Sequence, residues 1–459
     1  MYVHFPAMSQ EDKLRTLPPI EWSDVVIEPQ TALEIANLAR YPREFALEMS
    51  GGEPVYRILN WNGSGIAISA RDGRRIQGVA SDEALKNVRQ NLAAPTATLF
   101  KTNIHSDQWT VAGYWNSSRP FHVISLNDAL DTHYYVSIET GEIVLDTVRS
   151  ERFWNYLGAI PHWVYFEFIR IDTDKWFWVI IVMSTIGIFV AVSGLWLGIS
   201  RLRKPFRHRS ISPFRHWMKW HHIAGVFGGI FLLAWMITGL LSMYPGGFLE
   251  QRSITQSELE QYADNISPRF DSTGLRALAA QDVDARQASF VWLGGRPFTL
   301  LQGNSQSNVS VVGRSGSVEH LPDTDIFAAA ERLMPMATMV LGNRLLEGDE
   351  YWHTGFTTRS LPVLRVAFDD PSNTWFHIDP ATGKIFGILD DTGRLDRWTN
   401  SGIHDVDLAF LHQHKPLWDI VVWLLSLAGL FISISGVVIG YRRLTATLRG
   451  HMHLDEVSQ

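Results

Sequence analysis

Three long stretches of the chain contain only uncharged, mostly apolar residues. They run over residues 176–200, 223–249 and 420–441, and polar sequence separates them. At about 1.5 Å per residue, about 20 helical residues cross a hydrocarbon core about 30 Å thick. An apolar helix buried in a soluble protein is usually shorter, about 10 to 14 residues. The pattern therefore predicts three transmembrane helices.

Basic residues lie at one end of each predicted span. Residues 201–216 join the first two spans and contain six Lys and Arg residues and no acid, and Arg442 and Arg443 follow the third span. Because Lys and Arg favour the cytoplasmic side, this loop and the tail are expected in the cytoplasm and the two long polar segments outside it. The absence of cysteine favours a bacterial periplasm over a eukaryotic cell surface. We expect a multi-pass protein of the bacterial inner membrane.

The expected organisation follows from these positions. Its parts are a periplasmic domain over 1–162, a span with its outer approach over 163–200, a cytoplasmic loop over 201–216, a span over 217–245, a second periplasmic domain over 246–410, a span with its outer approach over 411–441, and a cytoplasmic tail over 442–459.

Both outer segments show short strands joined by turns. Residues 134–138 and 142–145 flank Thr140-Gly141, which is typical of a hairpin with glycine in the turn. Residues 375–379 and 384–388 repeat the pattern around Thr382-Gly383. With helical patterns over 30–40 and 324–333, each segment is expected to fold as an α+β domain.

The two hairpins and the spans after them superimpose with one offset of 242 residues and no gap. Thr140-Gly141 matches Thr382-Gly383, His162 matches His404, and Ser193-Gly194 matches Ser435-Gly436. The agreement indicates an internal duplication with pseudo-two-fold symmetry. The same offset places the partner of the second span before residue 1. We expect a fourth span upstream, the alternative being a three-span chain with an exterior N-terminus.

Composition limits the chemistry available. The chain has no cysteine, so disulfide scaffolds, iron–sulfur clusters, thiolate zinc sites and cysteine nucleophiles are excluded. It has 17 histidines, which are the strongest candidate metal ligands. No P-loop, dinucleotide-binding glycine pattern or nucleophile–base pair is visible, so any NADPH would be oxidised by another protein.

Histidines lie near both ends of the predicted spans. His221 and His222 are adjacent at the cytoplasmic end of the second span. A histidine there is either an interfacial anchor or an axial ligand of a haem between helices. Adjacent helical residues point about 100° apart, so only one of the two could face a given haem, and the sequence does not decide which.

His162 and His404 are repeat equivalents on the outer side. Two imidazoles from opposite halves would form a bis-His haem site suited to electron transfer. The alternative is that each caps a turn at the membrane surface. His412 and His414 add candidates without repeat counterparts; at this spacing a pair is usually solvated, although His412 is retained as a cofactor-binding candidate.

These segments carry a family resemblance. They are Ile-Pro-His-Trp at 160–163, Trp-His-His-Ile-Ala-Gly at 220–225, Ile-His-Asp-Val-Asp at 403–407 and Phe-Leu-His-Gln-His-Lys-Pro-Leu-Trp-Asp at 410–419. The chain resembles the PepSY-associated transmembrane family over essentially its whole length. The resemblance implies four spans, two periplasmic PepSY-like domains and, in some members, di-haem ferrisiderophore reductase activity. It also implies that the upstream span supplies a histidine equivalent to His221 or His222.

Two functions are therefore considered. The leading hypothesis is a membrane oxidoreductase that holds up to two b-type haems and passes electrons from an unidentified cytoplasmic donor to a periplasmic acceptor, such as a ferric siderophore in iron uptake. The alternative is a membrane-anchored PepSY module that binds or regulates a peptide or protease without redox activity. The lipid bilayer is the expected environment, and no nucleic-acid partner is expected.

Overall fold

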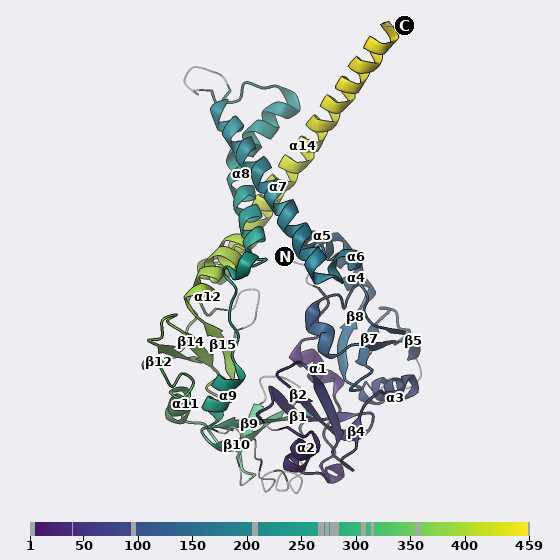
Figure 1. The fold of residues 1–459 in the computed structure, drawn as a ribbon, viewed down its shortest axis with the longest axis vertical. Coiled ribbons are helices and arrows are strands. Elements are labelled where there is room, and N and C mark those ends of the chain that lie inside the picture. Colours follow the sequence, from purple (N-terminus) through teal and green to yellow (C-terminus); the bar gives the residue numbers. More distant parts are fainter. Residues whose placement is uncertain are drawn as a thin grey trace. The chain divides into compact units, whose positions relative to one another are not determined.

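The computed structural model describes residues 5–38, 40–92, 98–203, 210–264, 270, 275, 284–303, 309–313, 316–353 and 359–457. The chain divides into two compact units (Figure 1). The sheet unit comprises Met1–Trp176, Arg252–Leu346 and Pro362–Asp390. The helical unit comprises Phe177–Gln251, Glu347–Leu361 and Asp391–Gln459.

The largest sheet of the sheet unit contains strands from both polar segments. Within the described residues it has seven strands in the order β11-β10-β9-β1-β2-β3-β4. The two segments meet where β1 and β9 pair antiparallel, with Ala46 opposite Ser289. The strands are β1 (Glu44–Ser50), β2 (Glu53–Leu59), β3 (Gly65–Ser69), β4 (Arg75–Ile76), β9 (Gln287–Leu293), β10 (Arg296–Gln302) and β11 (Val309–Val312). The helices of these regions are α1 (Gln10–Thr16), η1 (Trp22–Asp24), α2 (Pro29–Ile35) and α9 (Gln256–Ala263).

Two four-stranded antiparallel sheets complete the described strands. One has the order β5-β6-β7-β8 and the other β12-β13-β14-β15. Their bounds are β5 (Leu99–Ile104), β6 (Phe121–Ser125), β7 (His133–Ser137), β8 (Ile143–Thr147), β12 (Met339–Leu345), β13 (Val363–Phe368), β14 (Trp375–Ile378) and β15 (Ile385–Leu389). The helix α3 (Ser81–Asn91) packs on the first of these sheets and α11 (Asp323–Ala330) on the second.

Both predicted hairpins are present, as β7–β8 and β14–β15. Their turns place Gly141 and Gly383 at the same φ of 70°. This left-handed conformation costs glycine little and most other residues more, which explains why a Thr-Gly pair recurs there. The remaining short helices of the sheet unit are η2 (Gly113–Ser117), α4 (Arg149–Leu157), α5 (Ala159–Trp163) and α6 (Glu167–Arg170).

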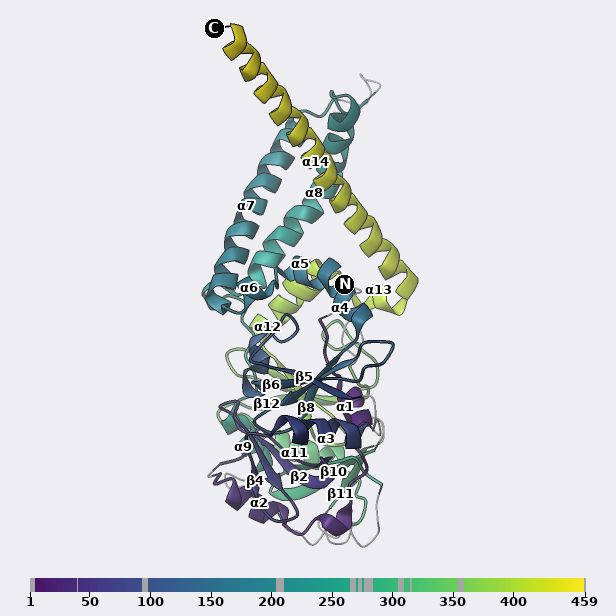
Figure 2. The ribbon, with the colours of Figure 1, turned by 90° about the vertical axis from the view of Figure 1, so that its right-hand side faces the viewer.

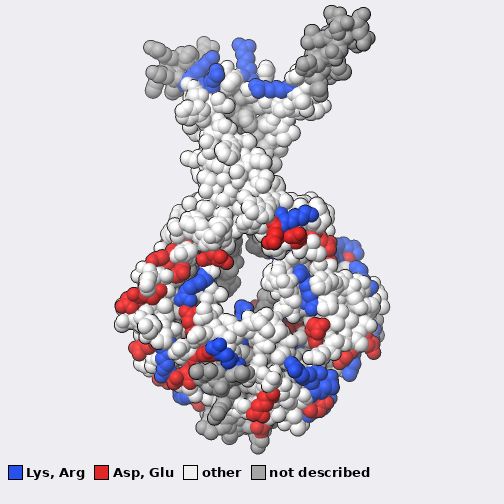
Figure 3. Space-filling view, in the orientation of Figure 1, with Lys and Arg blue, Asp and Glu red and all other residues white. Residues whose placement is uncertain are grey.

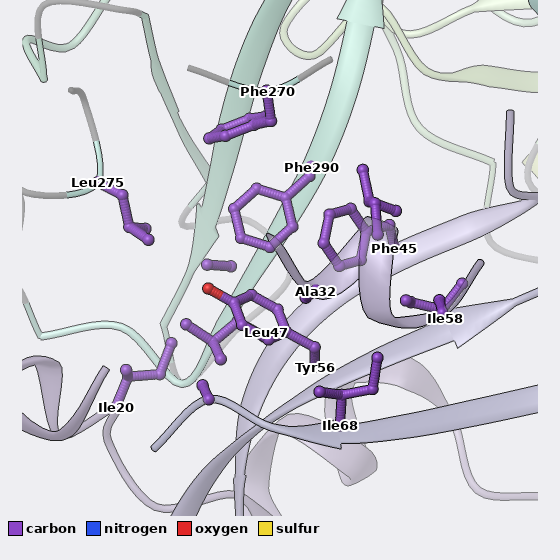
Figure 4. Close-up of a cluster of buried hydrophobic side chains, with 14 of the residues drawn as sticks. Ile20, Ala32, Phe45, Leu47, Tyr56, Ile58, Ile68, Phe270, Leu275 and Phe290 are labelled. Atoms are coloured by element: carbon purple, nitrogen blue, oxygen red, sulfur yellow. The ribbon is translucent and has the colours of Figure 1, made fainter. Parts of the chain in front are cut away.

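The main core of the sheet unit lies on the seven-stranded sheet and draws side chains from both segments (Figure 4). Phe45 on β1 and Phe290 on β9 have ring centroids 4.6 Å apart. Leu47, Tyr56 and Ile68 are fully buried beside them. Burial of each such side chain stabilises the fold by about 1.5–3 kcal/mol. The two segments therefore share a hydrophobic core as well as a sheet.

A charged network is buried beside this core. Glu48 on β1 is 1% exposed, and its carboxylate lies 3.1 Å from Nε of Arg57 and 3.6 Å from Nζ of Lys13. Nε2 of Gln287 on β9 donates a hydrogen bond to the same carboxylate at 2.9 Å. Lys13 also pairs with Glu142. Burial alone would lower the pKa of Lys13, but Glu142 and Glu48 outweigh it and raise this pKa.

Glu142 is expected to make the sheet unit sensitive to acid. Burial opposes its ionisation, but the positive charges of Lys13 and Arg57 hold the pKa of its carboxyl below the ordinary 4.5. A depressed carboxyl pKa contributes stability above the unfolded value, and this contribution is lost as pH falls through the folded value. Chemical unfolding at a series of pH values should show the wild type losing more stability below about pH 4.5 than Glu142→Gln. Equal acid sensitivity of the two proteins would contradict this role.

Among the described residues, three helices of the chain are long and apolar enough to cross a membrane. They are α7 (Thr173–Ser200), α8 (His216–Leu241) and the span Pro416–Thr447 within α14 (Lys415–Val457). The second helix ends eight residues before the predicted Leu249. Pro245-Gly246-Gly247 forms the short turn η3, with Tyr244 at a φ of 48°, and this backbone cannot continue the helix. The rest of the helical unit contains α12 (Asp391–Asp396), the π-helix η4 (Arg397–His404) and α13 (Ala409–Gln413).

Side chains of α8 pack against glycines of α7 and of α14, and α14 crosses α8 (Figure 2). A Cβ added to Gly187 on α7 would lie 2.8 Å from Sδ of Met236, and one added to Gly429 on α14 would lie 3.3 Å from Leu232. Both contacted residues are on α8. Small residues at such positions let membrane helices pack closely, which is typical of helix association in lipid.

Charged side chains are absent from the middle of the described spans and gather at their ends (Figure 3). At one end lie the exposed Arg201 and Arg203, after α7, and Arg442 and Arg443, at the end of the span in α14. Residues 204–209 of the predicted basic loop lie outside the described residues. The apolar lengths and the terminal charges fit helices that cross a bilayer.

Candidate histidine site of the membrane helices

His221, on the first turns of α8, is fixed by α14. Its Nδ1 lies 2.8 Å from Oγ of Ser435, which is fully buried. The Ser435 hydroxyl donates to the carbonyl of Phe431 at 2.7 Å, so it accepts from His221. We therefore assign the proton of the neutral ring to Nδ1, which leaves the lone pair on Nε2. Nε2 is the atom through which such a ring would ligate a metal.

His222 differs from its neighbour because both of its ring nitrogens are hydrogen-bonded. Its Nε2 lies 2.8 Å from the carbonyl oxygen of Gly198, and its Nδ1 lies 3.0 Å from Oγ of Ser212. A carbonyl only accepts, so Nε2 of His222 carries the proton and donates. The ring is 7% exposed and packs edge-on against Phe214. His222 thus ties α7 to α8, and of the adjacent pair His221 has the geometry of a ligand.

His404 ends η4 and is held by the opposite end of α8. Its Nδ1 lies 2.9 Å from Oγ1 of Thr238, whose hydroxyl donates to the carbonyl of Ala234 at 2.9 Å. Nδ1 of His404 is therefore the donor in its neutral form, as in His221, and Nε2 carries the lone pair. His404 is the last residue of this π-helix, and single π turns are frequent at functional sites.

His162 lies in the sheet unit, on the short helix α5, and its side chain is exposed. Its backbone N–H donates to the carbonyl of Gly158 at 3.1 Å, which fixes the turn. Trp163, the next residue, accepts a hydrogen bond from the indole of Trp176 at 2.9 Å. His162 and His404 belong to different units, and their pairing on one iron stays a prediction.

His412 enters a polar cluster around Asp407. Its Nε2 lies 2.7 Å from Oδ1 of Asp407, and Nε2 of His353 lies 3.0 Å from the same oxygen. The ring of His412 also stacks on Trp418, with ring centroids 5.2 Å apart. Arg397 donates to the backbone carbonyl of Asp407 at 2.6 Å. These contacts anchor the start of α14 to the preceding loop, and the cofactor role of His412 stays a prediction.

The ionisation of Asp407 follows from its neighbours. Burial opposes it, but the hydrogen bond from His353 and the nearby positive charge of Arg397 hold the pKa of Asp407 below its ordinary value. Asp407 is therefore an anionic centre for this cluster.

The remaining histidine of the sequence pattern is His414. Its Nδ1 lies 3.0 Å from the carbonyl oxygen of Phe410, one turn earlier.

The sequence did not reveal the contacts that His353, Thr238 and Ser435 make. His353 lies 54 residues before its partner Asp407, and no periodic pattern links the two. The Ser435-Gly436 pair did stand out as a repeated element, but nothing in the sequence connected it to His221. Such pairings depend on helix packing, which residue spacing alone does not give.

The donors fit a haem better than a bare metal ion. Within the described residues, no group of three or more His, Asp and Glu side chains is arranged to hold a metal ion. A porphyrin supplies four nitrogens itself and needs one or two axial ligands from the protein. Single imidazoles with the lone pair on Nε2, as in His221 and His404, meet that requirement.

Part of the chain matches a known protein family. Residues 58–289, which include α7, α8 and the four-stranded sheet β5–β8, match the PepSY-associated TM region family. No match was found among curated proteins or among solved structures. The family match covers just over half of the 459 residues and includes the first two of the three apolar helices. The chain is therefore a membrane protein of the PepSY-associated TM region family.

Proposed function

We propose that this protein is a b-type haem protein of the bacterial inner membrane that passes electrons across the bilayer to a periplasmic acceptor, such as the iron of a ferric siderophore. The observation that carries the proposal is the matched setting of His221 and His404. Each is bound through Nδ1 to a hydroxyl of a neighbouring element, and each keeps the Nε2 lone pair. His221 lies near the start of α8, and Thr238, which binds His404, lies near its end.

The spacing along α8 suits a stepwise path. His221 and Thr238 are 17 residues apart on the same helix, which corresponds to about 25 Å of axial rise. This length covers most of a hydrocarbon core about 30 Å thick. A six-coordinate haem supplies a one-electron carrier, and two of them would divide the crossing into shorter steps. His221 would hold the cytoplasmic haem, and His404, together with His162, the outer one.

The proposal includes a duplicated architecture with periplasmic polar segments. In support of duplication, elements that the offset relates begin 242 residues apart: α3 and α11, β6 and β13, β8 and β15, and α7 and α14. In support of the orientation, Arg201, Arg203, Arg442 and Arg443 lie at one end of the spans, the end favoured for the cytoplasm. The acceptor would then meet the protein on the side of His404.

Absorption spectroscopy tests this function. The protein would be expressed with a supply of haem, purified in detergent, and measured in the oxidised and the dithionite-reduced state. We expect a Soret band and sharpened reduced-state bands of a bis-His b-type haem. Reoxidation of the reduced protein by a ferric siderophore, followed at the same bands, would test the acceptor.

A folded protein without haem would contradict the proposal. A protein that is folded, as shown by helical circular dichroism and a single elution peak, and that has no Soret absorbance would end the redox proposal. The binding or regulatory PepSY module would then be the better account, with the histidines serving only to tie helices together.

A further inference from the structure

Each of the two candidate ligands lies against a hydroxyl residue that is followed by a glycine. We call this pair of residues the seat of the histidine. His221 bonds Ser435, and a Cβ added to the next residue, Gly436, would lie 3.5 Å from Cε1 of the ring. His404 bonds Thr238, and a Cβ added to Gly239 would lie 3.6 Å from its Cε1. One seat is on α14 and the other on α8. The hydroxyl fixes Nδ1, and the glycine leaves room for the ring edge.

The chemistry of the seat selects one tautomer. In each seat the hydroxyl proton is used on a carbonyl of its own helix, that of Phe431 or Ala234. With the hydroxyl proton assigned in this way, the oxygen offers lone pairs to the ring, and the imidazole is assigned as the donor from Nδ1. In an apolar surrounding, a mispaired ring would leave a polar group unsatisfied, which is costly. Nε2 is thereby left as the basic atom.

Hydroxyls alone do not form such a seat. Ser433, two residues before Ser435, donates to the carbonyl of Gly429 at 3.0 Å. Ser242 near the end of α8 donates to the carbonyl of Gly239 at 2.9 Å. No histidine contact of either serine is found among the described residues. These serines provide matched controls on the same helices.

We propose that Ser435 and Thr238 are positioning residues for haem, which orient His221 and His404 and tune the basicity of Nε2 toward the iron. This inference rests on the proposed haem function and deepens it. A hydrogen bond donated from the second ring nitrogen makes a histidine a stronger ligand, and loss of such a partner typically lowers metal affinity by about 10–100-fold. A stronger donor favours ferric iron, so loss of the bond also raises the midpoint potential.

The test compares variants that keep and remove each hydroxyl. Thr238→Val keeps the shape and removes the hydroxyl, whereas Thr238→Ser keeps the hydroxyl. Ser435→Ala removes the hydroxyl that binds His221. Ser433→Ala and Ser242→Ala are the controls. Haem titration and redox titration of the purified full chain are the readouts. We expect Thr238→Val and Ser435→Ala to lose about 10–100-fold in haem affinity at one site and to show a raised midpoint potential, while Thr238→Ser and both controls match the wild type.

The results distinguish failure of the proposed haem function from failure of the positioning role alone. If the wild type binds no haem, the proposed function fails and this inference fails with it. If the wild type binds haem and Thr238→Val and Ser435→Ala keep its affinity and potential, the hydroxyls only clamp the helices and the inference alone is overturned. If one of these variants does not fold, the other seat, with its serine control, decides.

Discussion

Replacing His221 by glutamine is expected to remove one haem equivalent per chain, whereas the same replacement of His222 leaves haem content unchanged. Nε2 of His221 carries the lone pair, because Nδ1 donates to Ser435. Nε2 of His222 carries the proton, because it donates to the carbonyl of Gly198. A protonated nitrogen cannot ligate iron. The measurement is the haem-to-protein ratio from the reduced pyridine-treated spectrum of each purified variant.

Glutamine makes the two variants comparable. It is close to histidine in length and both donates and accepts hydrogen bonds, so His222→Gln can keep its contacts to Gly198 and Ser212. Helical circular dichroism of both variants establishes that the membrane helices remain folded. Loss of haem from His222→Gln with full haem in His221→Gln would reverse the assignment of the ligand.

The structural basis of this prediction was only partly visible in the sequence. Three spans follow from uncharged length, and both hairpins follow from alternating residues around Thr-Gly turns, because these signals are local. The choice between His221 and His222 was not available, since it depends on Ser435 and Gly198, which lie on other helices. Residue spacing shows that the two rings point apart but not what each one meets.

Long-range strand pairing was also beyond the sequence. The polar segments were expected as separate domains over 1–162 and 246–410, and the structure joins them through β1 and β9. These strands are separated by more than 200 residues and two spans, and antiparallel pairing at that distance leaves no local periodicity. Glu48 gave a hint, because an acid within an apolar strand pattern needs buried partners, but it does not name them.

Replacing Glu48 by alanine is expected to destabilise the sheet unit by about 3–5 kcal/mol. Glu48 is 1% exposed, and its carboxylate accepts hydrogen bonds from Arg57 at 3.1 Å and from Gln287 at 2.9 Å. Its removal leaves the partly buried cations Arg57 and Lys13 with less compensation and the amide of Gln287 without its acceptor. Denaturant unfolding of the detergent-purified protein, followed by tryptophan fluorescence, measures the change in the free energy of unfolding.

Glu11→Ala is the matched control, because Glu11 pairs with Arg15 at the surface, where the two side chains are 45% and 64% exposed. Solvent-exposed pairs contribute only about 0–1 kcal/mol. Glu48→Gln adds a second comparison, since it keeps an acceptor for Gln287 and removes only the charge. Its loss in the free energy of unfolding should fall between the losses of the other two variants.

Glu48 lies where β1 meets β9, and Glu48→Ala should therefore weaken the attachment of the two polar segments to each other. A loss below about 1 kcal/mol for Glu48→Ala would mean that Arg57 and Lys13 find other partners, Glu142 among them, and that the buried carboxylate does not hold this junction.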